Sequence, residues 1–459
     1  MRSLEEMPFT RQKILISDFL GLLLIIISSL LLGIWAVKGT IALRNILLGL
    51  GTLASLFYIY QYFKFNQQKI PIRNWIPIIM LGLMFCWVIF HYFFLSRFPE
   101  LQLHELKSTW LRSVLATVVG IGTGIAIVRR PNAVNFLWLG ILISFAYLFY
   151  QYIPLAISTN NINYHGYEQF IYPGKISGVL AGTLLIAGLL GTTLDLYQNL
   201  GKSSKFFLLI FWLLGICTSL YADVYIFDTR NGVGLAVLIF GLVSLGFFFK
   251  TLLGGAAGNE IFKRIAFIAL LLGVVGWFSW QQIKLNPGWA SILDDAKIAV
   301  QINQYPNWQN PRVLGYPKSA SGQNITANTY ERLSWATAGV IIFVPENPLG
   351  VGILSKPFGV LLNSTFPSSG NYIVSTHSAW VELTLAFGIP GLVLTLGAII
   401  AAFVLSVGAK EKFKYLPMVM SLAIILLYTV GEISSQHSIE ILCFMIALLS
   451  TSLFPNKGA

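Results

Sequence analysis

The chain has 459 residues, of which 56% are hydrophobic and only 10% are charged, whereas soluble domains carry roughly 25% charged residues. This composition excludes a protein built mainly of soluble domains. The net charge of +12 at pH 7 would suit nucleic-acid binding. The basic residues flank apolar runs instead of forming one patch, however, so we interpret them as topology signals and contacts with anionic membrane lipid or phosphate, and expect no nucleic-acid partner.

Twelve apolar runs follow one another along the chain, each close to the ~20 residues that cross a bilayer as a helix. The sequence therefore predicts an all-α polytopic membrane protein. The first run is too long for a signal-peptide core and lacks a small-residue cleavage site behind it, so we expect a retained helix. The tenth run contains Gly388-Ile389-Pro390-Gly391, which would interrupt its helix. The expected spans are 15–36, 42–62, 75–95, 109–128, 134–153, 176–196, 206–225, 232–249, 264–283, 379–407, 415–433 and 438–454.

Basic residues are distributed unevenly between the two ends of these runs. With the N-terminus placed in the cytoplasm, the segments on that side hold seventeen Lys and Arg residues, and the short outer loops hold five. Lys and Arg accumulate in cytoplasmic loops of membrane proteins. We therefore expect both termini in the cytoplasm.

One connection is much longer than the others. Residues 284–376 form an outer loop of about 90 residues that is rich in Asn, Pro, Ser and aromatic residues, and TYERLSWATAGVIIFVPEN within it has a helical apolar period. Because long ordered loops usually carry function, we expect any chemistry on the outer face. The chain accordingly divides into residues 1–283 with spans one to nine, 284–376 as an outer loop with amphipathic helices, and 377–459 with spans ten to twelve.

Two arginines lie within predicted spans, near their outer ends. A charge in a span costs at least ~2.5 kcal/mol on insertion scales, so such groups usually have a structural or functional role. Arg44 and Arg112 are each a few residues into a helix. Either their side chains extend to the lipid headgroups, or they form a cationic wall facing an anionic ligand.

Two further arginines lie at predicted helix starts. Arg230 is part of DTRNGVG, where a guanidinium beside free backbone N–H groups would suit a phosphate. The alternative is a surface ion pair of Arg230 with Asp228 or Asp223. Arg332 opens the amphipathic stretch of the long loop, where Glu331 is its alternative partner.

His377 lies between the long loop and the interrupted tenth span. The five histidines show no H-E-x-x-H or comparable spacing, so no metal site is expected. A lone histidine at a membrane edge can be a structural group, but a neutral imidazole beside a broken helix could also accept a proton near neutral pH. Glu382 lies about 140° further round a helix. We therefore expect it to meet an arginine or the membrane interface instead of His377.

Three stretches of the chain carry motif-like sequences: TRNGVGLAV (229–237), ERLSWATAGVIIFVPENPLGVG (331–352) and HSAWVELTLAFGIPG (377–391). Together they resemble the bacterial O-antigen ligase and O-antigen polymerase superfamily, whose patterns are Ser-Arg-Asn/Gly, Arg-Leu…Trp…Pro-Leu-Gly-x-Gly and His-Asn-x-x-Leu…Gly-x-x-Gly. Motif order, sidedness and the long outer loop agree. The resemblance covers residues 220–410 closely and the N-terminal half only as hydropathy. Ser378 and Val381 replace the Asn and Leu of the family pattern.

The resemblance implies a glycosyltransferase of the bacterial inner membrane with its active site in the periplasm. Its donor would be a glycan on undecaprenyl pyrophosphate, and its acceptor a sugar hydroxyl of the lipid A core. Pyrophosphate is a good leaving group, and cations can neutralise the charge that develops on it. Direct attack on the anomeric carbon predicts inversion. Because the sequence shows no Asp-x-Asp pair, we expect metal-independent transfer without a cofactor.

The same resemblance implies roles for individual residues. His377 would be the general base that takes the proton of the acceptor hydroxyl. Four arginines would hold the diphosphate, two of them as the main ligands and two as helpers, and two further residues would support the site. These are Arg230 and Arg332, then Arg44 and Arg112, and then Ser378 and Glu382.

Other functions share these features. An O-antigen polymerase, whose acceptor is a second lipid-linked repeat unit, and a protein O-oligosaccharyltransferase belong to the same superfamily, and the loop sequence does not separate them from a ligase. A lipid-linked oligosaccharide flippase or another transporter would also suit twelve spans. Transporters typically contain paired broken helices in two related halves, and the sequence shows no such symmetry, so we favour an enzyme.

Overall fold

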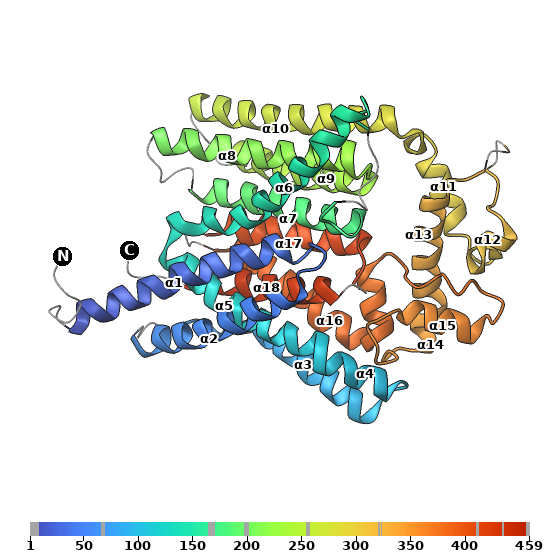
Figure 1. The fold of residues 1–459 in the computed structure, drawn as a ribbon, viewed down its shortest axis with the longest axis horizontal. Coiled ribbons are helices and arrows are strands. Elements are labelled where there is room, and N and C mark those ends of the chain that lie inside the picture. The colour runs from blue at the N-terminus through green and yellow to red at the C-terminus, as the bar shows by residue number, and fades with distance from the viewer. Residues whose placement is uncertain are drawn as a thin grey trace.

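A computed structural model shows the chain as a bundle of long helices with a group of short helices beyond one end (Figure 1). The structure describes residues 9–65, 69–163, 170–196, 202–253, 258–319, 322, 324–409, 413–433 and 436–455. No strand forms within these ranges, so the predicted all-α class holds for this part of the chain.

Among the described residues, nine helical segments are long and apolar enough to cross a membrane, and three further apolar helices are shorter. Each predicted span overlaps one of these segments, which is consistent with an all-α polytopic membrane protein. The helices are α1 (Phe9–Ile34), α2 (Ile41–Phe65), α3 (Ile76–Phe94), α4 (Pro99–Glu105), α5 (Leu111–Arg129), α6 (Leu139–Ser158), α7 (Lys175–Leu196), α8 (Lys202–Tyr221), α9 (Arg230–Leu253), α10 (Gly258–Leu285), α11 (Ile292–Ala299), α12 (Pro311–Leu314), α13 (Ala327–Ala338), α14 (Val344–Glu346), α15 (Pro357–Thr365), α16 (Ala379–Val407), α17 (Tyr415–Val430) and α18 (Gln436–Thr451).

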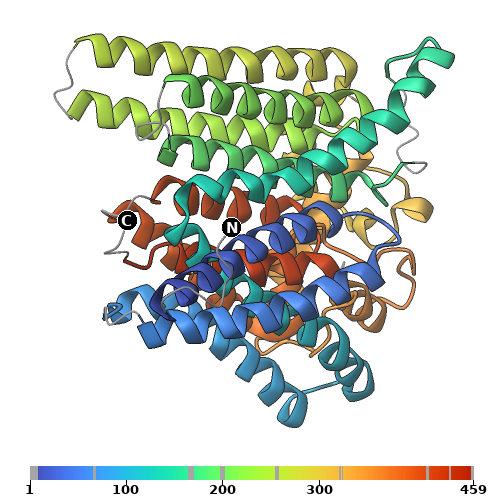
Figure 2. The ribbon, with the colours of Figure 1, turned by 60° about the vertical axis from the view of Figure 1, so that its left-hand side comes forward.

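The helix α18 forms the centre of the bundle. Residues 438–454 are all buried, as expected for a mainly apolar helix that is surrounded by other helices. Small residues of α5 allow its close approach, because a Cβ at Gly120 or Gly124 would meet the α18 backbone. Figure 2 shows the green and yellow-green helices of residues 202–285 on one side of the bundle and the blue helices α2 and α3 on the opposite side.

The helix α16 is interrupted where the sequence predicted, starting one residue earlier. Phe387 (φ −125°, ψ 15°) and Gly388 (φ 71°, ψ −174°) leave the helical conformation. The N–H groups of Val351 and Gly352 donate to the carbonyls of the two residues before the break, at 3.0 and 2.8 Å. Trp87 of α3 donates its indole N–H to the Phe387 carbonyl at 2.8 Å. The Pro-Leu-Gly-x-Gly segment therefore satisfies the backbone groups that the break exposes.

Gly388 is expected to be essential for this junction. Its φ is positive, and a Cβ would lie against the backbone of Pro348 and Leu349, which cannot move aside as a side chain could. We expect Gly388→Ala to destabilise the protein by about 2–3 kcal/mol, seen as a lower thermal unfolding midpoint of the detergent-solubilised chain. Gly82→Ala in α3 is the matched control, since its Cβ would meet open space. Equal midpoints for the two variants would contradict this account.

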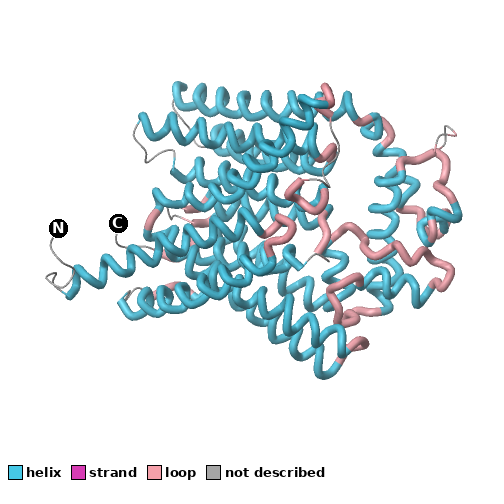
Figure 3. Tube along the Cα trace, in the orientation of Figure 1, coloured by secondary structure: helices cyan, strands magenta, loops and turns pink. Residues whose placement is uncertain are grey.

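The residues between α10 and α16 form a smaller unit with its own apolar core, in which Trp308 and Phe343 are buried. Most of the loops of the described chain lie at this end (Figure 3). Glu105 of α4 ties the unit to the bundle. Its carboxylate accepts hydrogen bonds from the N–H groups of Leu354 (2.7 Å) and Ser355 (2.8 Å) and from the Ser355 hydroxyl (2.6 Å). This attachment fixes the short helices relative to the start of α16.

Candidate active site

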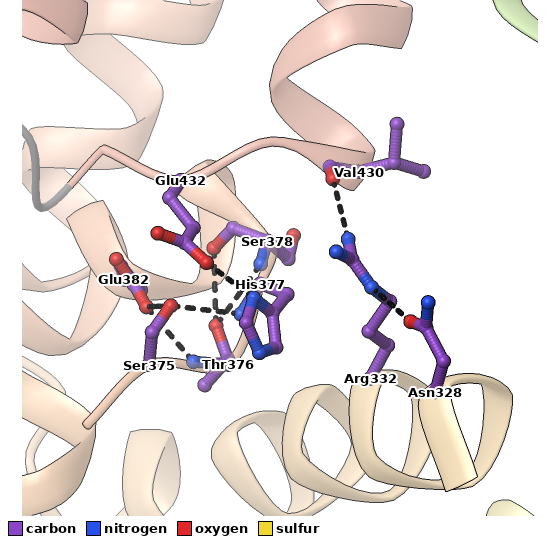
Figure 4. Close-up of polar contacts among 9 residues, drawn as sticks. All are labelled: Asn328, Arg332, Ser375, Thr376, His377, Ser378, Glu382, Val430 and Glu432. Atoms are coloured by element: carbon purple, nitrogen blue, oxygen red, sulfur yellow. Dashed lines mark hydrogen bonds and ion pairs between the residues drawn. The ribbon is translucent and has the colours of Figure 1, made fainter. Parts of the chain in front are cut away.

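The loop before α16 holds His377 in a strained backbone conformation (Figure 4). Its φ is 57°, a left-handed value that is costly for a residue with a side chain. The N–H of His377 donates to Ser375 Oγ at 3.0 Å. Glu382, in the first turns of α16, accepts hydrogen bonds from the Thr376 N–H (2.8 Å) and from the Ser375 hydroxyl. Ser378 is the N-cap residue of α16, and its N–H donates to Thr376 Oγ1 at 3.2 Å.

These contacts show what Glu382 and Ser378, the two predicted supporting residues, bond to. Both Glu382 and Ser378 contact the loop that carries His377. Among the described residues, however, Glu382 meets Ser375 and Thr376 in place of the arginine that the sequence suggested. A buried carboxylate in this position fixes the strained loop because it satisfies two of its donors.

The imidazole of His377 contacts residues from two other segments. Its Nδ1 atom pairs with Glu432 Oε1, in the segment that follows α17. Its ring stacks on Trp335 of α13, with 5.7 Å between ring centroids and 25° between planes. The His377 side chain is 24% exposed, so it remains accessible. Because Nδ1 faces the carboxylate, Nε2 is the nitrogen that can exchange a proton with a ligand.

Glu432 is held in its ionised form. Burial raises the pKa of its carboxyl group, but the hydrogen bond and charge of His377, together with the charge of Arg332, outweigh burial and bring the pKa below its usual value. An ionised carboxylate at Nδ1 fixes the orientation of an imidazole and stabilises its protonated form. The pair therefore has the arrangement of a general base with its orienting group.

Arg332 connects α13 to the end of α17. Its Nε donates to Asn328 Oδ1 at 2.6 Å, and its Nη1 donates to the Val430 carbonyl at 3.2 Å (Figure 4). Burial lowers the pKa of this guanidinium, Glu432 acts to raise it, and Arg230 lowers it further. The alternative partner Glu331 instead accepts a hydrogen bond from Tyr316 at 2.7 Å.

Arg230 is the first residue of α9 and also reaches α13. Its Nη1 donates to the Gly288 carbonyl at 2.8 Å, and its Nη2 donates to Thr329 Oγ1 at 3.2 Å. Asp228 and Asp295 act on it electrostatically. The hydrogen bonds of Arg230 therefore join the start of α9 to the smaller unit between α10 and α16. A surface ion pair, the alternative considered for Arg230, would not make this connection.

The helix α13 thus brings three of the predicted residues together. Arg332 belongs to it, Arg230 is bonded to it, and His377 stacks on it. Thr329, which accepts a hydrogen bond from Arg230, lies three residues before Arg332 on α13, so the two arginines meet the same face of this helix. An anionic ligand that both guanidinium groups contact would accept several charge-assisted hydrogen bonds. The site can therefore combine an anion with a proton acceptor.

Arg44 and Arg112 belong to a second cluster, centred on Glu440 of α18. Arg112 Nε lies 2.6 Å from Glu440 Oε1, and the indole N–H of Trp35 donates to Glu440 Oε2 at 3.0 Å. Arg44 Nη1 donates to the Trp35 carbonyl at 3.4 Å. Arg44 is only 5% exposed, which excludes the headgroup contact considered for it. These contacts place Arg112 on Glu440 of α18, and Arg44 on Trp35, which itself donates to Glu440.

Sequence reasoning missed Glu432 and Trp335. The predicted span 415–433 includes Glu432 near its outer end, where an acidic residue is costly and is therefore a usable signal. Trp335 was visible only as one apolar residue of an amphipathic stretch. Nothing in its local sequence distinguishes a residue that stacks on a histidine from one that fills a core.

No protein-family model matches this chain, and no curated protein matches it. Within the described residues, no three His, Cys, Asp or Glu side chains lie together in a way that could hold a metal ion. The site is accordingly interpreted from its own residues.

The pairing of Glu432 predicts a pH-dependent stability difference. Because the folded-state pKa of Glu432 is lowered, its contribution is present above the unfolded pKa of about 4.3 and is lost as pH falls through the lower folded value. For a partly exposed pair we expect Glu432→Gln to cost about 1 kcal/mol at pH 7. Thermal unfolding midpoints of both proteins should differ at pH 7 and converge below about pH 4. A difference that grows toward low pH would contradict the lowered pKa.

Proposed function

We propose that the chain is an O-antigen ligase, which transfers a glycan from undecaprenyl pyrophosphate to a sugar hydroxyl of the lipid A core. The observation that carries the proposal is the meeting of Arg230, Arg332 and His377 at α13. Each comes from one of the three motifs that resemble the superfamily. Two cations and one base are the groups that transfer from a lipid-linked diphosphate requires.

The proposal includes a topology. The twelve predicted spans would cross the bacterial inner membrane, with both termini in the cytoplasm and residues 284–376 in the periplasm. It is supported by the uneven distribution of Lys and Arg along the sequence. It is also supported by the position of α11, α13 and α15 beyond one end of the bundle (Figure 1), since His377 stacks on Trp335 of α13.

In the proposed reaction, His377 Nε2 accepts the proton of the acceptor hydroxyl while its oxygen attacks the anomeric carbon of the donor. The bond from that carbon to the diphosphate oxygen breaks, and undecaprenyl pyrophosphate leaves with the bonding electrons. Arg230 and Arg332 neutralise the charge that develops on the leaving group. Glu432 stabilises the imidazolium ion through Nδ1. Attack from the opposite face inverts the anomeric configuration.

The products in a deletion strain test this function. A ligase predicts bare lipid A core together with accumulated long lipid-linked polymer, both seen by mass spectrometry of the lipopolysaccharide and lipid fractions. A core that carries a single repeat unit would indicate a polymerase instead. Normal lipopolysaccharide with unglycosylated protein would indicate a protein O-oligosaccharyltransferase. Lipid-linked repeat units confined to the cytoplasmic leaflet would indicate a flippase.

A further inference from the structure

A groove at the other end of the bundle is separate from the candidate active site. It has a volume of about 470 Å³ and lies between α9, α16 and α17. Both α9 and α16 begin beside the active site, and α17 ends there, whereas the groove is lined by the opposite ends of all three helices. Along α9, Gly246 lies 16 residues beyond Arg230, or about 24 Å at ~1.5 Å per residue.

The walls of this groove are mainly apolar. Phe247 of α9 stacks on Tyr415 of α17, with 5.6 Å between ring centroids. The groove opens beside Leu242 and Val407, which are 44% and 62% exposed. If the candidate spans α9 and α16 cross a membrane, these exposed side chains would face bilayer hydrocarbon. The groove is therefore filled by a hydrocarbon chain more favourably than by water.

Among the described residues that line the groove, Lys414 is the one cation. Lys414 directly precedes α17, and its Nζ atom is 5.1 Å from the centre of the Tyr415 ring. The nearby Asp195 attracts it electrostatically. Both Asp195 carboxylate oxygens already accept hydrogen bonds from backbone N–H groups of residues 414–416, at 2.8 to 3.1 Å. The ammonium group thus lies beside the apolar groove, at the start of α17, where it could contact the phosphate of a lipid whose acyl chain fills the groove.

We propose that this groove binds one anionic phospholipid, with an acyl chain between α9, α16 and α17 and its phosphate against Lys414. The shape and apolar lining select a chain, and the cation selects the charge of the headgroup. The occupied groove would join three helices that each have their other end at the active site, which makes the lipid a stabilising component of the fold.

The test compares two lipids on the purified full chain in detergent. Dioleoyl-phosphatidylglycerol should raise the thermal unfolding midpoint more than dioleoyl-phosphatidylcholine, which has the same acyl chains. Native mass spectrometry should detect one bound phosphatidylglycerol per chain, with occupancy about fivefold higher than that of phosphatidylcholine, the factor expected for one lysine at a membrane surface. Equal binding of the two lipids would overturn the proposal.

Two pairs of variants locate the site. Gly246 lines the groove and Gly241 of the same helix does not, and a Cβ at either position meets open space. Gly246→Leu should fill the groove and abolish the rise in unfolding midpoint that phosphatidylglycerol causes, whereas Gly241→Leu should retain this rise. Lys414→Gln should reduce the preference for phosphatidylglycerol about fivefold, whereas Lys64→Gln at the end of α2 should not. Loss of this rise in either control, or its retention in Gly246→Leu, would overturn the proposed location.

Discussion

His377→Ala is expected to abolish glycan transfer while the protein still accumulates and folds, at a cost of about 1 kcal/mol for the lost Glu432 pair. General-base catalysis contributes about 10²- to 10⁴-fold, so the initial rate with a lipid-linked glycan and a lipid A core acceptor should fall by at least two orders of magnitude. The loop that carries His377 is held by Ser375, Thr376 and Glu382 through backbone and side-chain bonds that do not involve the imidazole. The substitution should therefore remove the base without releasing the loop.

The matched control is His104→Ala. His104 is an exposed histidine in α4, outside the residues that contact His377, and its removal should leave the rate unchanged. Both variants are compared with the wild-type protein by product formation and by unfolding midpoint. An unchanged rate for His377→Ala would exclude the base assignment, and a lost rate for His104→Ala would show that the assay is not specific to the site.

The transmembrane part of the fold could be predicted because its cause is local. A run of apolar residues of bilayer length becomes a helix, since every backbone group must be bonded within the segment. The break in α16 was predictable for the same reason, because Gly388 and Pro390 disfavour a continuous helix. The local sequence does not show which groups bond the carbonyls that the break exposes. The N–H groups of Val351 and Gly352 come from a segment more than thirty residues earlier.

The candidate site shows the same division between local and long-range information. Its charged residues were recognisable one by one, since a charged or titratable side chain near a span is costly and usually has a structural or functional role. Their partners were not. Glu432 lies 55 residues after His377, and Glu440 lies in an apolar run that was interpreted as an ordinary span. Only the packing of α18 in the bundle centre shows that Glu440 gathers Arg44 and Arg112 into a separate cluster.

Arg230→Lys is expected to lose transfer almost as completely as His377→Ala. The guanidinium of Arg230 uses Nη1 for Gly288 and Nη2 for Thr329, which fixes its plane and leaves further donors of the same fork for a diphosphate. A lysine ammonium keeps the charge but cannot reproduce this geometry. Removing one donor that stabilises developing charge costs about 10²- to 10³-fold in rate. We expect a loss of that size in kcat, with reduced inhibition by added inorganic pyrophosphate.

Arg312→Lys is the control for a conservative arginine change in the smaller unit between α10 and α16. Arg312 lies 3.7 Å from the centre of the Tyr372 ring and has no part in the Arg230 contacts, so its replacement should cost stability at most. A purely structural role for Arg230 makes a different prediction: its lysine variant would unfold at lower temperature but keep wild-type sensitivity to pyrophosphate. Full transfer activity in Arg230→Lys would contradict the diphosphate role, because it would show that a point charge at the start of α9 is sufficient.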